Sequence, residues 1–144
     1  MVRVGSWAEM IGFGVPDCRP PIPAFPFALM RHALPDGSHH FDLLLAASPH
    51  VPEEAREVAT WRCNVDPWTL PIGGEASIER IAPHRGLYLR LTEPRELGGD
   101  RGNVTPMRRG TYAMRDGVIE TMQDTHTFLR MNGDRLQRVA PPLT

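Results

Sequence analysis

Residues 111–139 read TYAMRDGVIETMQDTHTFLRMNGDRLQRV, and this stretch contains two strong hairpin signals. Asp116-Gly117 and Asn132-Gly133-Asp134 each separate two short segments of mixed apolar and polar residues. Tight hairpin turns need backbone with φ > 0, which Asp-Gly and Asn-Gly pairs adopt readily. The expected strands are 111–115, 118–122, 127–131 and 135–139.

A third hairpin is expected further towards the N-terminus. The turn Pro35-Asp36-Gly37-Ser38 joins the apolar run 27–31 to 40–47, which reads HFDLLLAA. Other strands are expected at 59–64, 76–81 and 86–91, with a short helical turn at 53–58. These elements predict a mainly all-β fold, a small antiparallel β-barrel of about eight strands with one or two short helices, because closure removes exposed sheet edges.

The chain of 144 residues fits a single domain. Residues 1–24 are rich in Pro and Gly, so we expect an irregular N-terminal arm that packs on the domain, with a helical turn near 7–11. Residues 25–144 then form the β-barrel domain.

Composition narrows the function classes. The formal net charge of −1 offers no overall basic field for coating nucleic acid, although every basic residue is an arginine, whose planar fork suits phosphate. Two cysteines, Cys18 and Cys63, do not make a disulfide scaffold, and we expect both to be packing residues in a reduced, cytoplasmic setting. No segment is apolar enough for a membrane span.

Three metal-ligand types gather in the hairpin at 27–47. His40 and Asp42 are two apart, so in a strand they share a face that excludes His39, and His32 lies at the facing end of the other arm. Two imidazoles and one carboxylate suit Mn, Fe or Zn and leave coordination positions open, as a catalytic metal requires. A set of solvated polar residues around a turn is the competing interpretation.

A second pair of candidates is His84 and Tyr88 in the sequence HRGLY. If a strand begins at Gly86, even spacing places both on one side, where they can stabilise a phosphoryl oxygen or supply a proton. A loop histidine and a packing tyrosine are the plainer interpretation. The glycine-rich loop 98–102 is not a P-loop, because no Gly-Lys-Ser/Thr follows it.

In this order, the motifs resemble the 3′-phosphoesterase domain of bacterial DNA ligase D and its stand-alone relatives. The resemblance runs from about Phe25 to the hairpin after Tyr112, and no single motif in it is specific. The matching pieces are Met30-Arg31-His32, His40-Phe41-Asp42-Leu43, His84-Arg85-Gly86-Leu87-Tyr88 and Gly98 through Tyr112.

The resemblance implies a compact β-barrel enzyme, a metal-dependent phosphoesterase that heals DNA 3′ ends by removing a 3′-ribonucleoside and then the 3′-phosphate. It implies that His32, His40 and Asp42 bind Mn²⁺, with Zn²⁺ or another divalent metal as alternatives, and that His84 and Tyr88 lie at the scissile phosphate. The partners would be DNA 3′ ends of primer–templates and a separately encoded DNA ligase or polymerase.

The chain departs from the family's best-known members at two positions. Where they read His-Tyr-Asp-Phe-Arg-Leu-Glu, Leu44 replaces the phosphate-contacting Arg and Ala46 replaces the Glu. Losing one charge-assisted contact costs about 1.5–3 kcal/mol unless another arginine compensates, and the candidates are Arg31, Arg90 and Arg101. Two alternatives therefore stay open: a non-catalytic module that binds nucleic-acid ends or proteins, and a metal-dependent hydrolase of a small phosphate ester.

Overall fold

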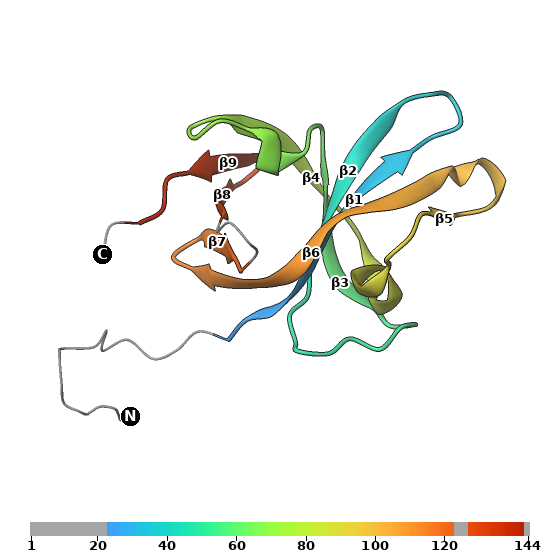
Figure 1. Ribbon diagram of the computed structural model, residues 1–144, viewed down its shortest axis with the longest axis horizontal. Helices are drawn as coiled ribbons and strands as arrows, with labels where there is room; N and C mark the ends of the chain where they lie inside the picture. Colours follow the sequence, from blue (N-terminus) through green and yellow to red (C-terminus); the bar gives the residue numbers. More distant parts are fainter. Residues whose placement is uncertain (1–22, 123–126, 143–144) are drawn as a thin grey trace.

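The computed structural model describes residues 23–122 and 127–142, which form one antiparallel sheet of nine strands (Figure 1). Three short 3-10 helices interrupt the strands. The elements are β1 Phe25–Ala33, β2 His39–Leu45, β3 Arg56–Cys63, η1 Pro67–Thr69, β4 Glu75–Arg85, η2 Gly86–Arg90, β5 Arg95–Glu96, η3 Gly99–Arg101, β6 Asn103–Arg115, β7 Val118–Thr121, β8 Thr127–Asn132 and β9 Arg135–Val139.

The sheet closes on itself in a ring. The strand order is β1-β2-β3-β4-β9-β8-β7-β6, and β6 also pairs with β1 along the whole length of β1, while β5 pairs with the outer edge of β6. Closure satisfies the backbone groups that an open sheet would leave at its edges. The expected mainly β fold with antiparallel strands and few helices is confirmed.

Two apolar cores lie on opposite faces of β1 and β2. Phe27 and Leu29 of β1 pack inside the ring with Leu43 of β2, whereas Ala28 and Met30 alternate to the outer face and pack with Leu44 in a second cluster. A strand that is buried on both faces needs a continuous apolar run, which explains why 40–47 does not alternate.

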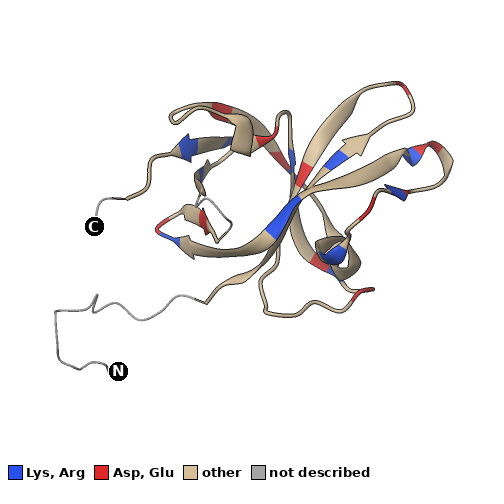
Figure 2. Ribbon diagram, viewed as in Figure 1, with Lys and Arg blue, Asp and Glu red and all other residues tan. Residues whose placement is uncertain are grey.

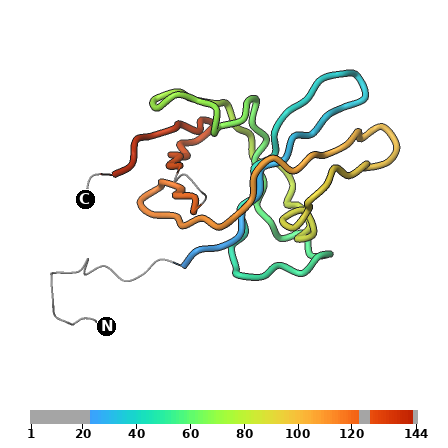
Figure 3. The backbone as a smooth tube through the Cα atoms, viewed as in Figure 1, coloured from blue at the N-terminus to red at the C-terminus, as the bar shows by residue number. Residues whose placement is uncertain are grey.

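The second cluster is covered by η2 and the segments around it. Leu89 of η2 packs with Val51 and Val58, and Tyr88, Leu91 and Leu97 lie at its margin. Figure 3 shows the hairpin of β1 and β2 extending beyond the ring beside the start of β6, which agrees with the pairing of Ala33 and Asn103. The outer face of β1 and β2 is therefore the floor of a second, smaller layer.

Two of the expected elements are wrong. Residues 86–91 were expected as a strand, but 86–90 form the 3-10 helix η2, because Leu89 and Leu91 pack on the second cluster and do not pair in the sheet. Residues 53–58 form a turn and the start of β3, since Arg56 pairs with Arg85. The expected hairpins at 111–122 and 127–139 are confirmed, and Asp116 adopts φ 55° in its turn.

Several further features were not expected from the sequence. Strand β6 begins at Asn103, eight residues before the expected strand, and η1 and β5 were not predicted, although Asp66 and Pro67 begin η1 as its N-cap and first residue. The helical turn expected near residues 7–11 lies outside the described residues, as does Cys18, while residues 23–24 precede β1 and are exposed. Among the described residues, no helix is long and apolar enough to cross a membrane.

Leu44 gives a test of the second cluster, because it is fully buried there. Replacing it with Ala removes buried apolar surface and leaves a cavity, so Leu44→Ala should lower the free energy of unfolding by about 2–5 kcal/mol. Urea denaturation measures this change. Ile72→Ala is the control, since Ile72 is 61% exposed and its loss should change stability by less than about 0.5 kcal/mol. Equal effects of the two substitutions would mean that the second cluster is not a packed core.

Cys63 is a packing residue inside the ring, where burial raises the pKa of its thiol to about 12 and the carboxylates of Asp42 and Asp66 add to the shift. Thiolate is the reactive form, so native Cys63 should resist alkylation between about pH 7 and 9. The measurement is thiol labelling of a Cys18→Ser variant, with the same variant in denaturant as the control. Rapid native labelling that accelerates with pH would contradict the buried, protonated thiol.

Candidate metal and phosphate site

The structure brings His32, His40 and Asp42 together. His32 and His40 are cross-strand partners on β1 and β2, and Asp42 follows on the same face of β2, opposite Met30. One ligand atom from each of the three residues lies within 4.8 Å of the others. The register of a single hairpin therefore assembles the site, because directly paired residues and residues two apart share a face.

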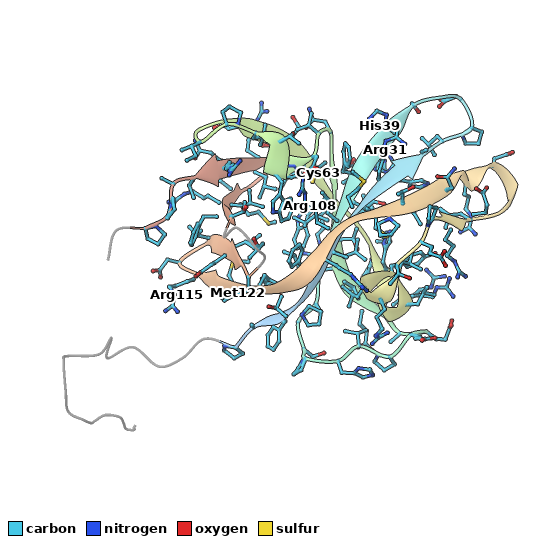
Figure 4. All side chains as sticks on the ribbon, in the orientation of Figure 1. Arg31, His39, Cys63, Arg108, Arg115 and Met122 are labelled. Atoms are coloured by element: carbon cyan, nitrogen blue, oxygen red, sulfur yellow. The ribbon has the colours of Figure 1, made fainter. Side chains whose placement is uncertain are left out.

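Strand alternation excludes His39, as expected. His39 packs edge-on against Phe41, with ring centroids 5.6 Å apart, on the face opposite Asp42. Arg31 pairs with Phe41 and so also points to that opposite face, and Figure 4 shows Arg31 and His39 along the same hairpin. Neither side chain belongs to the site.

The carboxylate of Asp42 is buried and surrounded by three imidazoles. Its side chain is 2% exposed, and its oxygens lie 3.7 Å from His32 Nδ1, 3.3 Å from His40 Nε2 and 3.7 Å from His84 Nε2. His84 comes from the end of β4, which pairs with β3. The third imidazole therefore reaches Asp42 from outside the hairpin.

Two polar atoms at the centre of this cluster have no hydrogen-bond partner among the described residues. They are His40 Nε2 and Asp42 Oδ1, and both are buried. An unsatisfied buried polar atom costs about 1–3 kcal/mol, so native proteins rarely leave two side by side without a ligand. A divalent cation would satisfy both atoms, and the donor set of two imidazoles and a carboxylate fits it.

The surroundings prepare the two hairpin imidazoles for coordination. His32 Nε2 donates a hydrogen bond to the backbone carbonyl of Arg101, 2.7 Å away, which orients the ring with Nδ1 facing Asp42. Burial lowers the pKa of His40, and the opposing effect of the Asp42 carboxylate does not restore it. Neutral imidazole is the form that binds metals, and the lowered pKa of His40 favours that form.

The glycine-rich loop at 98–102 holds the carbonyl that orients His32. Gly102 has φ +77°, and a Cβ there would meet the Ala33 carbonyl oxygen at 1.9 Å. The loop thus packs directly on the end of β1, and the Arg101 guanidinium donates to the Leu97 carbonyl oxygen and fixes it further. The loop has a positioning role for His32.

The cluster lies at the edge of a pocket of about 380 Å³. His32, Asp42, His84 and Tyr88 all line it, and the His84 and Tyr88 rings are in edge contact with centroids 5.6 Å apart. The sequence predicted this pairing from even spacing along a single strand. That reason is wrong, because His84 ends β4 and Tyr88 lies on η2. The other residues that line the pocket are Leu34, Arg56, Arg85, Leu97, Asp100, Arg101 and Val104.

The arginines that line the pocket are mostly not the ones predicted from the sequence. Of the three candidates, only Arg101 lines the pocket, while Arg90 donates to the carbonyl oxygens of Gly86 and Val51 and thereby ties η2 to the segment before β3. Arg56 and Arg85 line the pocket and were not singled out from the sequence. The only sequence signal was that Arg85 directly follows His84.

Comparisons of the chain with protein-family models, with curated proteins and with solved structures found no match.

The buried carboxylate gives a test that separates metal binding from folding. Asp42→Asn keeps the shape of the side chain but removes a buried charge, so the metal-free variant should be within about 1 kcal/mol of the wild type, or more stable, near pH 8. Mn²⁺ binding should stabilise the wild type by about 2.7 kcal/mol at a hundredfold excess over Kd and so raise its Tm. Asp42→Asn should abolish this rise. Thermal unfolding with and without Mn²⁺ measures both effects. A metal-free variant destabilised by more than about 3 kcal/mol would make Asp42 a structural ion-pair partner.

Proposed function

We propose that this protein is a metal-dependent phosphoesterase that removes a 3′-phosphate or a 3′-terminal ribonucleotide from DNA ends. The observation that carries the proposal is the buried Asp42 carboxylate at the pocket, which has His32, His40 and His84 around it. Two buried polar atoms in this cluster have no hydrogen-bond partner among the described residues. All five residues on which the resemblance depends lie at this one site.

His32, His40 and Asp42 would hold the metal, with Mn²⁺ the first choice. Bound there, a divalent cation supplies Lewis-acid polarisation of a phosphoryl oxygen and lowers the pKa of water. The chain's own contribution is to fix the ligands before substrate arrives. The Arg101 carbonyl orients His32, and burial lowers the pKa of His40.

His84 and Tyr88 would act on the phosphate. His84 Nδ1 lies 3.2 Å from the Ala82 carbonyl oxygen, so a proton on Nδ1 is held there and Nε2 faces Asp42. In its protonated form, His84 donates from Nε2 to a phosphoryl or leaving-group oxygen, and the Tyr88 hydroxyl is a second donor. The leaving product is a DNA 3′-OH, the substrate that a separately encoded polymerase or ligase requires.

A second candidate function is hydrolysis of a small phosphate ester. The pocket volume of about 380 Å³ falls in the range of small-molecule sites, and the net charge of −1 gives no general attraction for DNA. Basic and acidic positions are interspersed along the ribbon in Figure 2. A panel of small esters and DNA ends separates the two functions by comparing kcat/KM.

The direct test is release of phosphate from a primer–template that ends in a 3′-phosphate. The wild type should release phosphate only with Mn²⁺ or a similar cation, and His40→Ala should lose at least about 100-fold in rate because it removes a metal ligand. His39→Ala is the matched control, since His39 lies on the opposite face of the same strand and its loss should change the rate less than about threefold.

The other outcomes are equally informative. Folded wild type that binds Mn²⁺ but releases no phosphate from DNA or small esters would favour the non-catalytic binding module. Equal losses in His39→Ala and His40→Ala would reject the ligand assignment.

A further inference from the structure

Two arginines from outside the β1–β2 hairpin line the pocket. Arg56 and Arg85 are direct cross-strand partners on β3 and β4, and both line the pocket. The register of these strands shifts between Arg56 and Val58, where Val58 pairs with His84. The irregularity occurs where two consecutive β4 residues, His84 and Arg85, both line the pocket.

The two guanidinium groups together attract anions. Like charges directly opposite each other on paired strands repel, and an anion near both relieves that repulsion. Arg85 already has one such anion, the exposed Glu54 carboxylate at 3.0 Å. A pair of arginines with a single exposed carboxylate beside it fits a surface that receives a further anion.

Both guanidinium groups have donors to spare. Arg85 uses Nη1 to bind Glu54 Oε1 at 3.0 Å, and its plane lies over the Tyr88 ring, with Cζ 5.6 Å from the centroid. The Arg56 side chain makes no hydrogen bond or ion pair with any other residue in ranges 23–122 and 127–142. A guanidinium has five N–H donors, so most of them remain for a ligand.

The other arginines near the site are held differently. Arg90 ties η2 to the segment before β3, and Arg31 faces the other side of the sheet. Arg101 also lines the pocket, but it donates to the Leu97 carbonyl oxygen of its own loop. Leu44, two positions beyond Asp42 on the same face, is fully buried among apolar side chains. Strand β2 therefore offers no guanidinium to the pocket, and the cross-strand arginine pair in the lining comes from β3 and β4.

We propose that Arg56 and Arg85 are the anion-recognition pair of this pocket, binding the non-bridging oxygens of a phosphoryl group in the pocket that His32, Asp42 and His84 also line. Glu54 is 78% exposed and competes with the anion for Arg85. The identity of the anion as the phosphate of a substrate rests on the proposed function, whereas the anion site itself is tested independently with inorganic phosphate.

The experiment measures the Kd for inorganic phosphate by titration of the Mn²⁺-loaded protein, together with KM and kcat on the 3′-phosphate primer–template. Arg56→Gln and Arg85→Gln should each raise the Kd for phosphate and KM by about 10- to 100-fold, the loss of one charge-assisted contact. Arg80→Gln is the matched control. Arg80 is exposed on β4, stacks on Trp61 outside the pocket and carries the same charge, so its loss should raise the Kd less than about threefold.

Glu54→Gln tests whether the Glu54 carboxylate competes with phosphate for Arg85, and it should strengthen phosphate binding. Freeing Arg85 from its carboxylate partner should lower the Kd for phosphate about two- to fivefold, the size expected of an exposed ion pair. Such a gain of affinity is not explained by misfolding, which would only weaken binding.

The outcomes separate this inference from the proposed function. Weakened phosphate binding in Arg56→Gln and Arg85→Gln, without turnover by the wild type, supports the anion pair and overturns the phosphoesterase. A wild type that binds no phosphate, or two variants that match Arg80→Gln, overturns the anion pair whether or not DNA ends are processed.

Discussion

Asp42 places a carboxylate on a strand that is buried on both faces, and the site is organised around that group. Its neighbours on the outer face of the hairpin are Met30 across the strands and Leu44 two positions along, both fully buried. Taking an ionised carboxylate out of water costs several kcal/mol unless partners compensate. Three imidazoles surround it at distances of 3.3–3.7 Å, and a bound cation would complete the compensation.

The second apolar cluster provides the low-dielectric floor for this charge. Leu89 from η2 and Val58 from β3 cover the outer face of the hairpin and leave the pocket at its margin. Electrostatic interactions are stronger where water is excluded, so the cluster strengthens every contact that Asp42 makes. Packing and chemistry are thus coupled at Leu44, whose apolar side chain belongs to the cluster and supplies no positive charge to the site.

Two chemically different groups of residues meet at the pocket. The β1–β2 hairpin contributes imidazole and carboxylate groups that suit a divalent cation, and the β3–β4 pair contributes guanidinium groups that suit an anion. His84 joins them, because it lies beside Arg85 in the sequence and points towards Asp42 in space. With a cation bound by the hairpin residues, a phosphoryl group in the pocket would meet positive charge from both groups, which is the general requirement for stabilising a phosphoryl-transfer transition state.

Local signals in the sequence were sufficient for the hairpins and for the cluster of His32, His40 and Asp42. Asp116-Gly117 and Asn132-Gly133 determine turns through backbone conformation, and His40 with Asp42 determines a shared face through the two-residue period of a strand. His32 could be added because the Pro35–Ser38 turn brings the two arms of one hairpin together. Each of these inferences needs only neighbours in sequence.

Only the tertiary structure decided how residues from distant strands meet. The register of β3 against β4 places Arg56 opposite Arg85, and the burial of the leucines at 86–91 turns an alternating pattern into a 3-10 helix. The closure of β1 onto β6 brings the Arg101 carbonyl to His32, 69 positions away. Such pairings depend on which strands become neighbours in a closed sheet, and that choice is made by burial over the whole chain, not by any local pattern.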